Sequence, residues 1–352
     1  MHILHVVGAR PNFVKAAPVL RAIRNRGVRQ TLVHTGQHYD RDMSDIFFIQ
    51  LDLPHPDVNL EVGSGSHTWQ TAEVMRRFEP VVLERKPDLV LVYGDVNSTI
   101  AAALVCSKLL IPVAHVEAGL RSFDTTMPEE INRVITDRLS DFLFTPSEDA
   151  DANLNREGVS EGKIHRVGNV MIDSLVRLLP AAQDHKRNGL PDRYAVVTLH
   201  RAANVDNNEN LEKIIDALVE ASDRLEVIFP VHPRTRQRIN QFGIDTRRLR
   251  LSEPLSFIEF LALESRAAFV VTDSGGIQEE TTYLGVPCLT MRANTERPIT
   301  VTSGTNVLVG NDKRKLIFEI ENILSGKGKR GTIPLLWDGH AGDRIANILC
   351  DS

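Results

Sequence analysis

The stretch FVVTDSGGIQEETTYLG, residues 269–285, decides the fold class. Its β-branched and aromatic start predicts a buried strand, and the residues after the glycines predict a helix. A strand that runs through a glycine turn into a helix is the building block of parallel sheets covered by helices. The stretch therefore predicts an α/β fold.

The same alternation of strand and helix patterns extends over nearly the whole chain, in two series. The strands expected in the first half are HILHVV (2–7), QTLVH (30–34), DLVLVY (88–93), PVAHVE (112–117), DFLFT (141–145) and KIHRV (163–167). Those expected in the second half are YAVVTLH (194–200), LEVIFPVH (225–232), RLRLS (248–252), AFVVTD (268–273), PCLTM (287–291) and TNVLV (305–309).

A polar stretch between the two series, residues 181–193, marks the boundary region together with Gly168 and Asn169. We expect an N-terminal Rossmann-like domain over residues 1–169, which carries the catalytic carboxylates, and a C-terminal one over residues 170–339, which binds a nucleotide. The final helix, residues 340–352, is expected to pack back on the first domain. The two parallel sheets are expected to face a central cleft.

The length of 352 residues agrees with two domains, because one hydrophobic core rarely supports a chain of this size. The net charge of -5 gives no electrostatic reason to bind nucleic acid or an acidic membrane, and no apolar run is long enough to span one. The three cysteines form no C-x-x-C pair, and the N-terminus lacks a signal-peptide core. We expect a cytoplasmic protein.

Polar residues follow the expected strands at their carboxyl ends, where open α/β sheets bind ligands. These residues are Arg10, Lys15, Asp95, Glu117, His200, Arg201, His232, Arg234 and the run Asp273 to Gly276. Each has a structural alternative, as a solvated charge, a half-buried histidine or a helix cap. Their recurrence at so many strand ends favours a binding site.

The turn formed by Ser274, Gly275 and Gly276 indicates an anion site, because it presents backbone N–H groups at the positive end of a helix. Glu280, one turn into that helix, is placed to accept hydrogen bonds from ribose hydroxyls. The alternative is an ordinary capped helix. The chain has no G-x-G-x-x-G after a strand, no P-loop and no H-E-x-x-H, so we expect no bound dinucleotide and no metal.

Three carboxylates are the acid and base candidates: Asp95, Glu117 and Glu129. Carboxylates that face a low-dielectric cleft raise one another's pKa, which gives one protonated acid and one ionised base. Arg133, one turn beyond Glu129, is expected to keep the second carboxylate charged. The alternative for Glu129 is structural, because Pro128 and the acidic residues after it also suit the start of a helix.

With these residues identified, the chain resembles the non-hydrolysing UDP-N-acetylglucosamine 2-epimerases, which have the two-domain glycosyltransferase-B architecture. The resemblance extends from one terminus to the other and keeps the order of the family's motifs. Those motifs are GARPNFVKAAP, HTGQHYD, VYGDVNST, HVEAGLRS, MPEEINR, LHRAANV, VHPRT, TDSGGIQEE, LGVPCLTMRANTERP and GTNVLVG.

The resemblance implies interconversion of UDP-GlcNAc and UDP-ManNAc for polysaccharide synthesis, through bound UDP and a 2-acetamidoglucal, with no separate cofactor and as a homodimer. Asp95, Glu117 and Glu129 are then the proton-handling carboxylates, and His200 joins the catalytic group while also holding pyrophosphate. The other implied substrate contacts are Arg10, Lys15, Arg133, His232, Ser274, Gly275, Gly276, Glu280 and Arg297.

The chain departs from the family pattern at two places. Residues 39–43 read Tyr-Asp-Arg-Asp-Met where many members have Arg-Glu-Met-Leu-Asp, in a region linked to activation by a second UDP-GlcNAc. Ala203 stands where many members have a glutamate. Related sequences include epimerases of UDP-diacetamido-uronic acids, so this substrate stays open as an alternative. A glycosyltransferase, a hydrolysing epimerase and an inactive sugar-nucleotide sensor are further alternatives.

Overall fold

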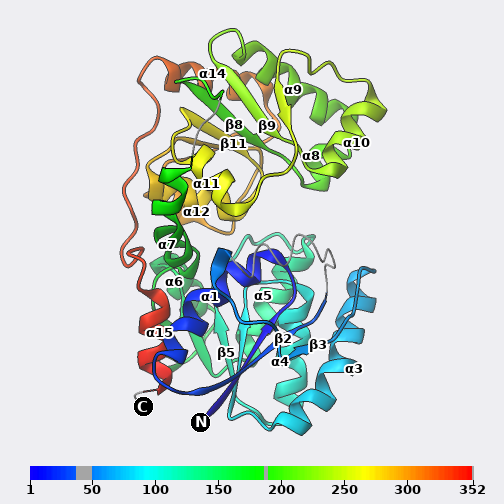
Figure 1. Cartoon of the computed structure of the whole chain (residues 1–352), viewed down its shortest axis with the longest axis vertical. Helices are drawn as coiled ribbons and strands as arrows, with labels where there is room; N and C mark the ends of the chain where they lie inside the picture. Colours follow the sequence, from blue (N-terminus) through cyan, green and yellow to red (C-terminus); the bar gives the residue numbers. More distant parts are fainter. Residues whose placement is uncertain (37–49, 186–188, 351–352) are drawn as a thin grey trace. The chain divides into compact units, whose positions relative to one another are not determined.

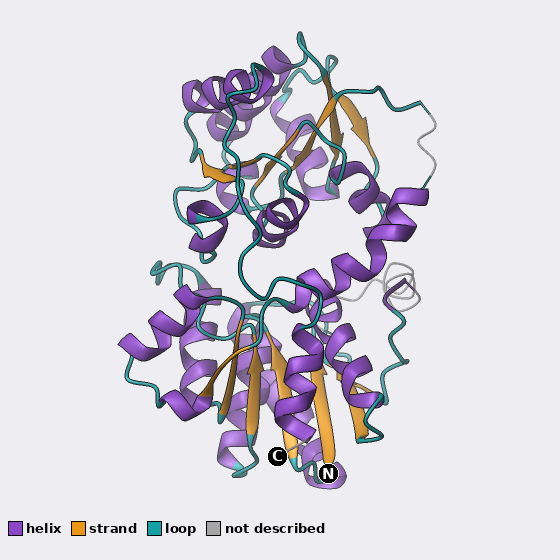
Figure 2. Cartoon of the chain, turned by 90° about the vertical axis from the view of Figure 1, so that its left-hand side faces the viewer, coloured by secondary structure: helices purple, strands orange, loops and turns teal. Residues whose placement is uncertain are grey.

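The computed structural model describes residues 1–36, 50–185 and 189–350. The chain divides into two compact units, each with a parallel β-sheet covered by helices (Figures 1 and 2). Unit 1 consists of Met1–Arg177 and Leu335–Ser352, and unit 2 of Leu178–Pro334. The predicted α/β class with two parallel sheets is confirmed.

The sheet of unit 1 has the strand order β3-β2-β1-β4-β5-β6-β7, and neighbouring strands are parallel. Its strands are β1 (His2–Val7), β2 (Arg29–His34), β3 (Val58–Asn59), β4 (Leu89–Tyr93), β5 (Val113–Val116), β6 (Phe142–Thr145) and β7 (Ile164–Arg166). All except β3 overlap a predicted run. A two-residue strand has no periodicity that a sequence pattern can reveal.

Helices alternate with these strands along the chain, as parallel pairing requires. They are α1 (Arg10–Arg24), α3 (His67–Arg85), α4 (Asn97–Lys108), α5 (Pro128–Leu139), α6 (Glu148–Arg156), α7 (Val170–Asp184), which contains the boundary between the units, and α15 (Ala341–Cys350). On one face of the sheet, Val6 and Val92 pack in the same core cluster as Phe78 of α3 and Ala102 of α4. Leu91, one residue before Val92, is also fully buried, because successive strand residues point to opposite, covered faces.

The sheet of unit 2 has the strand order β10-β9-β8-β11-β12-β13, again parallel. Its strands are β8 (Tyr194–Thr198), β9 (Glu226–Pro230), β10 (Arg250–Ser252), β11 (Phe269–Thr272), β12 (Cys288–Thr290) and β13 (Asn306–Leu308). Its helices are α8 (Ala202–Val205), α9 (Asn208–Ala221), α10 (Pro233–Phe242), α11 (Phe257–Glu264), α12 (Gly275–Leu284), α13 (Pro298–Thr302) and α14 (Lys313–Leu324).

Alternate strand residues of unit 2 belong to two different core clusters. Val197 and Val271 pack with residues of α9 and α14, such as Leu218 and Leu316. Their neighbours Val196 and Val270 pack instead with Leu263 of α11. Both faces of this sheet are therefore buried, which explains why its strands have continuous apolar sequences.

The helix α15 follows all of unit 2 in the sequence but lies along α1 in unit 1 (Figure 1). Its first turn is held by Asp173 of α7, which accepts hydrogen bonds from the backbone N–H groups of Ala341 (3.0 Å) and Gly342 (2.7 Å). The segment before it is held by the indole of Trp337, which donates to the carbonyl of Pro146 at 2.9 Å.

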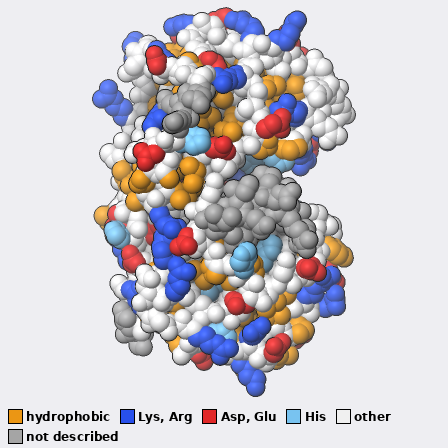
Figure 3. All heavy atoms as spheres, in the orientation of Figure 1, with side chains coloured by type: hydrophobic (Ala, Val, Ile, Leu, Met, Phe, Trp, Pro, Cys, Tyr) orange, Lys and Arg blue, Asp and Glu red, His pale blue; other side chains and the backbone are white. Residues whose placement is uncertain are grey.

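Lys and Arg side chains lie among Asp and Glu side chains over the face drawn in Figure 3. In the described ranges, none of the helices combines the length and the apolar character needed to cross a lipid bilayer.

Candidate functional site

The predicted site residues follow strands at the point where the strand order of each sheet reverses. This point lies between β1 and β4 in unit 1 and between β8 and β11 in unit 2. Open α/β sheets bind ligands at such switch points. At the carboxyl ends of the strands, Tyr93 of β4 pairs with Val116 of β5, and Thr198 of β8 pairs with Thr272 of β11. The residues that come directly after these paired strand ends therefore lie close together.

Glu117, directly after β5, forms a buried ion pair with Lys15 of α1. Only 7% of Glu117 and 4% of Lys15 is exposed. The backbone of Glu117 has a φ of 73°, a left-handed conformation that is uncommon for a residue with a side chain and is often found at functional sites. Gly94 leaves room for this pair, since a Cβ there would come within 2.6 Å of the Lys15 Nζ atom.

Asp95 follows β4, and one of its carboxylate oxygens accepts a hydrogen bond of 3.0 Å from Nε of Arg133. Arg133 is almost fully buried and also forms an ion pair with Glu130. Glu130 in turn accepts hydrogen bonds from the backbone N–H groups of Ser122 (2.9 Å) and Phe123 (2.8 Å). Glu130 therefore anchors the loop before α5 and orients the guanidinium that contacts Asp95.

Glu129 occupies a different setting from the other two candidate carboxylates. It lies half-buried in the first turn of α5, and its side chain makes no hydrogen bond or ion pair with any residue in the described ranges. The partners of Arg133 are Asp95 and Glu130 rather than Glu129. Arg133, which is expected to keep one of the candidate carboxylates charged, thus contacts Asp95, and Asp95 and Glu117 each have their own cation.

The turn between β1 and α1 is held by Asn12, which the sequence prediction overlooked. Its side-chain oxygen accepts hydrogen bonds from the backbone N–H groups of Gly8 (3.0 Å) and Ala9 (3.1 Å), and its amide nitrogen donates to the carbonyl of Tyr93 (2.8 Å). The turn is thereby tied to the end of β4. Arg10 is the first residue of α1, and its side chain lies outside the described part of the chain.

In unit 2, His200 follows β8 and contacts Asp273, which follows β11. The His200 Nδ1 atom lies 2.8 Å from the Asp273 carboxylate. Asp273 also accepts hydrogen bonds from the backbone N–H of Arg201 (2.9 Å) and the side chain of Asn204 (3.0 Å). Burial acts to raise the pKa of Asp273, but the hydrogen bond and charge of His200, with the other donors, outweigh it and hold the pKa below its ordinary value.

The glycine turn of unit 2 has an arginine packed directly on it. A Cβ at Gly275 would overlap the Nη1 atom of Arg297 and approach a carboxylate oxygen of Glu296 to 2.8 Å. Arg297 is held in place by ion pairs with Glu279 and Glu296. Backbone N–H groups of the turn at Ser274 and this guanidinium therefore lie together as hydrogen-bond donors suited to phosphate, beside the carboxylates of Glu279 and Glu296.

Glu280, the expected ribose acceptor, lies one turn into α12 with 3% of its surface exposed. Burial raises its pKa to about 8. Burial and the nearby Glu280 also raise the pKa of Glu264, at the end of α11. These two carboxyl groups thus form a buried acidic pair.

His232 directly precedes α10 and is exposed. Its Nδ1 atom accepts a hydrogen bond from the backbone N–H of Arg234 at 3.3 Å, so the side chain acts as a helix cap. Ala203, where many family members have a glutamate, is exposed on α8. Residues 39–43, where the chain departs from the family pattern, lie outside the described residues.

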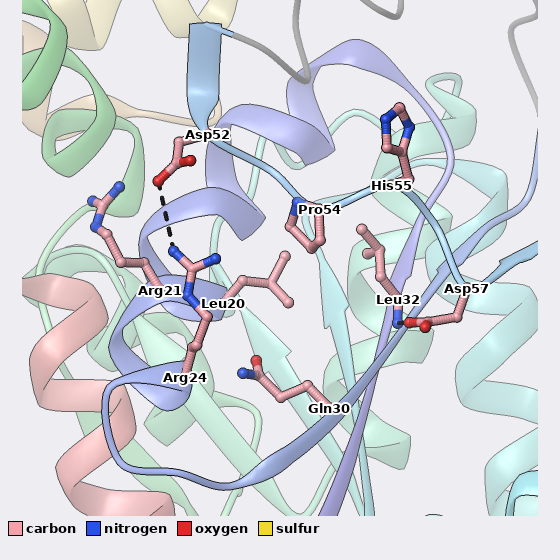
Figure 4. A pocket seen from close by; sticks show the side chains of 9 residues that line it. All are labelled: Leu20, Arg21, Arg24, Gln30, Leu32, Asp52, Pro54, His55 and Asp57. Atoms are coloured by element: carbon pink, nitrogen blue, oxygen red, sulfur yellow. Dashed lines mark hydrogen bonds and ion pairs between the residues drawn. The ribbon is translucent and has the colours of Figure 1, made fainter.

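A pocket of about 200 Å³ occurs elsewhere in unit 1, among α1, β2 and the segment before β3 (Figure 4). It is lined by Leu20, Arg21, Arg24, Gln30, Leu32, Asp52, Pro54, His55 and Asp57, none of which is a predicted site residue. Across residues 1–36, 50–185 and 189–350, His, Cys, Asp and Glu side chains form no group of three that could hold a metal ion.

Comparisons with known proteins agree over the full length of the chain. The family model described as UDP-N-acetylglucosamine 2-epimerase matches residues 21–350. A UDP-N-acetylglucosamine 2-epimerase from Methanocaldococcus jannaschii is 45% identical over 358 residues, which cover 98% of this chain and 97% of that protein. A UDP-2,3-diacetamido-2,3-dideoxy-D-glucuronate 2-epimerase from Pseudomonas aeruginosa is 44% identical over 353 residues, 99% of each chain.

A solved structure gives the same result for the fold. The crystal structure of the Methanocaldococcus jannaschii UDP-GlcNAc 2-epimerase in complex with UDP-GlcNAc and UDP has a TM-score of 0.93 to this chain at 44% identity, and each chain is covered completely.

Proposed function

The chain belongs to the UDP-N-acetylglucosamine 2-epimerase family, and from this premise we propose that it interconverts UDP-GlcNAc and UDP-ManNAc by elimination and re-addition of UDP. The observation that carries the proposal is the pair of carboxylates, Asp95 and Glu117, that follow adjacent strands and each contact a buried cation. Two such groups are what proton transfer at a sugar carbon requires.

The chemistry of the substrate explains why an elimination is needed. The C2 proton of the sugar has no adjacent carbonyl group to acidify it. When a base removes this proton, the electron pair of the C2–H bond can form a C1=C2 double bond while the C1–O bond to UDP breaks. The products are bound UDP and a 2-acetamidoglucal. A proton delivered to the other face of C2, with return of the UDP oxygen to C1, gives the epimer.

In unit 1 we assign the proton transfers to Asp95, Glu117 and Glu129. Lys15 and Arg133 act on two of them as fixed cations. The contrast in surroundings favours different roles, because Glu117 is buried against Lys15 whereas Asp95 and Glu129 are partly exposed.

In unit 2 we assign binding of the leaving pyrophosphate and ribose. His200 is oriented by Asp273, and the turn at Gly275 lies against Arg297, so hydrogen-bond donors and positive charge are fixed before the ligand arrives. Such preorganised donors stabilise the charge that develops on UDP as the C1–O bond breaks. The full set of assigned nucleotide contacts is Arg10, His200, His232, Ser274, Gly275, Gly276, Glu280 and Arg297.

A second candidate substrate is a UDP-diacetamido-uronic acid, the type of compound named for the Pseudomonas aeruginosa relative. Ala203 favours it, because a site that lacks a carboxylate beside the phosphates repels an additional anionic group on the sugar less strongly. The two candidates thus differ at C3, where the second carries an acetamido group in place of a hydroxyl, and at C6, where it carries a carboxylate.

The test is incubation of the purified protein in heavy water with UDP-GlcNAc and, separately, with the diacetamido-uronate analogue. We expect deuterium at C2 and formation of the 2-epimer with no acceptor present. The faster substrate is the natural class. Build-up of free sugar indicates a hydrolysing epimerase, a requirement for an acceptor indicates a glycosyltransferase, and UDP binding without any C2 exchange contradicts the proposed reaction.

A further inference from the structure

His115, in the middle of β5, is fully buried and has a hydrogen-bond partner at each ring nitrogen. Its Nδ1 atom lies 2.6 Å from a carboxylate oxygen of Asp137 on α5. Its Nε2 atom lies 2.8 Å from the carbonyl oxygen of Gly94. The two partners are distant in the sequence: Asp137 is 22 residues from His115, and Gly94 is 21 residues from it.

Asp137 is an ionised carboxylate that only accepts hydrogen bonds. Its second oxygen accepts from the backbone N–H of Gly119 (3.0 Å) and from Arg121 (2.7 Å). Burial acts to raise the pKa of Asp137, but the charges and hydrogen bonds of His115 and Arg121 outweigh it and hold the pKa below its ordinary value. Arg121 also binds Glu157 through two hydrogen bonds, of 2.8 and 2.7 Å.

The two partners of His115 determine how many protons its ring carries. A carboxylate and a carbonyl oxygen both accept, so both ring nitrogens have to donate. A neutral imidazole has only one N–H and would leave two buried acceptors facing each other. His115 is therefore an imidazolium, and its charge together with those of Asp137, Arg121 and Glu157 sums to zero.

Gly94 connects this imidazolium to the proposed catalytic carboxylates. Its carbonyl accepts from His115, and its N–H donates to the carbonyl of Val116 at 3.0 Å, so its peptide groups are held on both sides. Asp95 is the next residue after Gly94, and Glu117 is the next residue after Val116. On the other side, Gly94 packs against the Lys15 ammonium group, which pairs with Glu117.

We propose that His115 is a positioning residue, which donates a hydrogen bond from each ring nitrogen and whose bond to the Gly94 carbonyl sets the placement of Asp95 relative to Glu117. The catalytic consequence of this inference rests on the proposed function. The protonation of the His115 ring and its contact with Gly94 do not depend on that function. The charged groups that surround the ring are Asp137, Arg121 and Glu157, with the Lys15 and Glu117 pair beyond Gly94.

The first experiment measures the ring nitrogens of ¹⁵N-histidine-labelled protein by NMR at pH 7 and pH 9. His115 is identified by the signal that disappears in His115→Gln. We expect two protonated nitrogens at both pH values, and a ring with one bare nitrogen overturns the assignment. Asp137→Asn is the matched variant: its amide can donate to Nδ1 and still accept from Gly119 and Arg121. We expect every hydrogen bond to persist there with a neutral ring.

The second experiment compares two substitutions that each keep one of the two contacts. Glutamine places its amide nitrogen near the position of Nε2 and can still donate to Gly94, whereas asparagine places it near Nδ1 and can reach only Asp137. We expect His115→Asn to lower the C2 exchange rate about 10²-fold relative to His115→Gln, as misplaced catalytic groups do, with equal UDP affinity for both. Equal rates for the two variants contradict a positioning role.

A third measurement does not depend on activity. The Gly94 carbonyl and the Asp95 N–H belong to one peptide group, so loss of the bond to His115 alters the Asp95 amide signal. We expect that signal to move in His115→Asn and to stay in place in His115→Gln. If the unmodified protein exchanges C2 of neither sugar, the proposed function fails, while the Asp95 signal and the ring nitrogens still decide the role of His115.

Discussion

His200 and Asp273 form an ion pair across the ends of two adjacent strands, with the Nδ1 atom of His200 2.8 Å from the Asp273 carboxylate. Asp273 is fully buried, whereas 49% of the His200 side chain is exposed. The carboxylate therefore fixes the ring through Nδ1 and leaves Nε2 to meet a ligand. This arrangement is what a phosphate-binding histidine needs, because the ring direction is set before the nucleotide binds.

His200→Ala is expected to weaken UDP binding about 10- to 100-fold, the usual worth of a hydrogen bond to a charged group. Isothermal titration calorimetry with UDP measures the change. His340→Ala is the matched control, since His340 also contacts an aspartate through Nδ1 but lies exposed in unit 1. Unchanged affinity in His200→Ala removes His200 from the nucleotide site.

Asp95→Asn and Glu117→Gln are each expected to reduce C2 exchange by about 10²- to 10⁴-fold, because they remove a proton-transfer group but keep its size. UDP affinity should stay within a few-fold of that of the unmodified protein. Exchange rates from NMR in heavy water and affinities from calorimetry check both parts. A large loss of UDP affinity in either variant contradicts the division of roles between the units.

Gly275→Ala is expected to weaken UDP binding and to lower the Tm, because it disturbs the buried ion pairs of Arg297 with Glu279 and Glu296. The new methyl group overlaps the Arg297 guanidinium and pushes it from the glycine turn. Gly162→Ala is the control, because a Cβ there meets nothing within 4 Å and Gly162 does not have a positive φ. Calorimetry with UDP and thermal unfolding of both variants separate the two effects. Equal UDP affinity in the two variants means that Arg297 can move without consequence.

The buried pair Glu264 and Glu280 is expected to make the folded state less stable as pH rises. A glutamate in the unfolded chain titrates near 4.5, whereas burial raises the pKa of Glu280 to about 8. Between these values the folded state holds more protons than the unfolded state, so the free energy of unfolding falls with increasing pH. Glu264→Gln removes one of the two acids, and its Tm should fall less between pH 5 and pH 8. Parallel Tm curves for variant and unmodified protein contradict this reading.

Most of the fold follows from the sequence, because buried parallel strands need continuous apolar runs. HILHVV over residues 2–7 coincides with β1, and FVVT of the opening stretch coincides with β11. The exception in the described sheets, β3, is two residues long and depends on pairing with β2 rather than on its own composition.

The site was only partly predictable, for a physical reason. Asp95, Glu117 and Gly275 are predicted as site residues because strand ends and glycine turns are local patterns. His115 and Asp137 were overlooked, although His115 lies in the HVEAGLRS motif, because their importance comes from a contact across 22 residues. His232 was chosen for its place after a strand, and the structure adds a local role for its ring, as the cap of α10.

The docking of α15 on α1 affects how the chain is made as well as how it folds. A ribosome releases the sheet of unit 1 first, then all of unit 2, and only afterwards the segment Leu335–Cys350 that covers α1. During translation, the apolar surface of α1 therefore stays uncovered while the rest of the sheet of unit 1 and all of unit 2 are synthesised. A chain truncated before Leu335 lacks α15, so we expect unit 1 to keep the apolar surface of α1 exposed and to stay bound to chaperones.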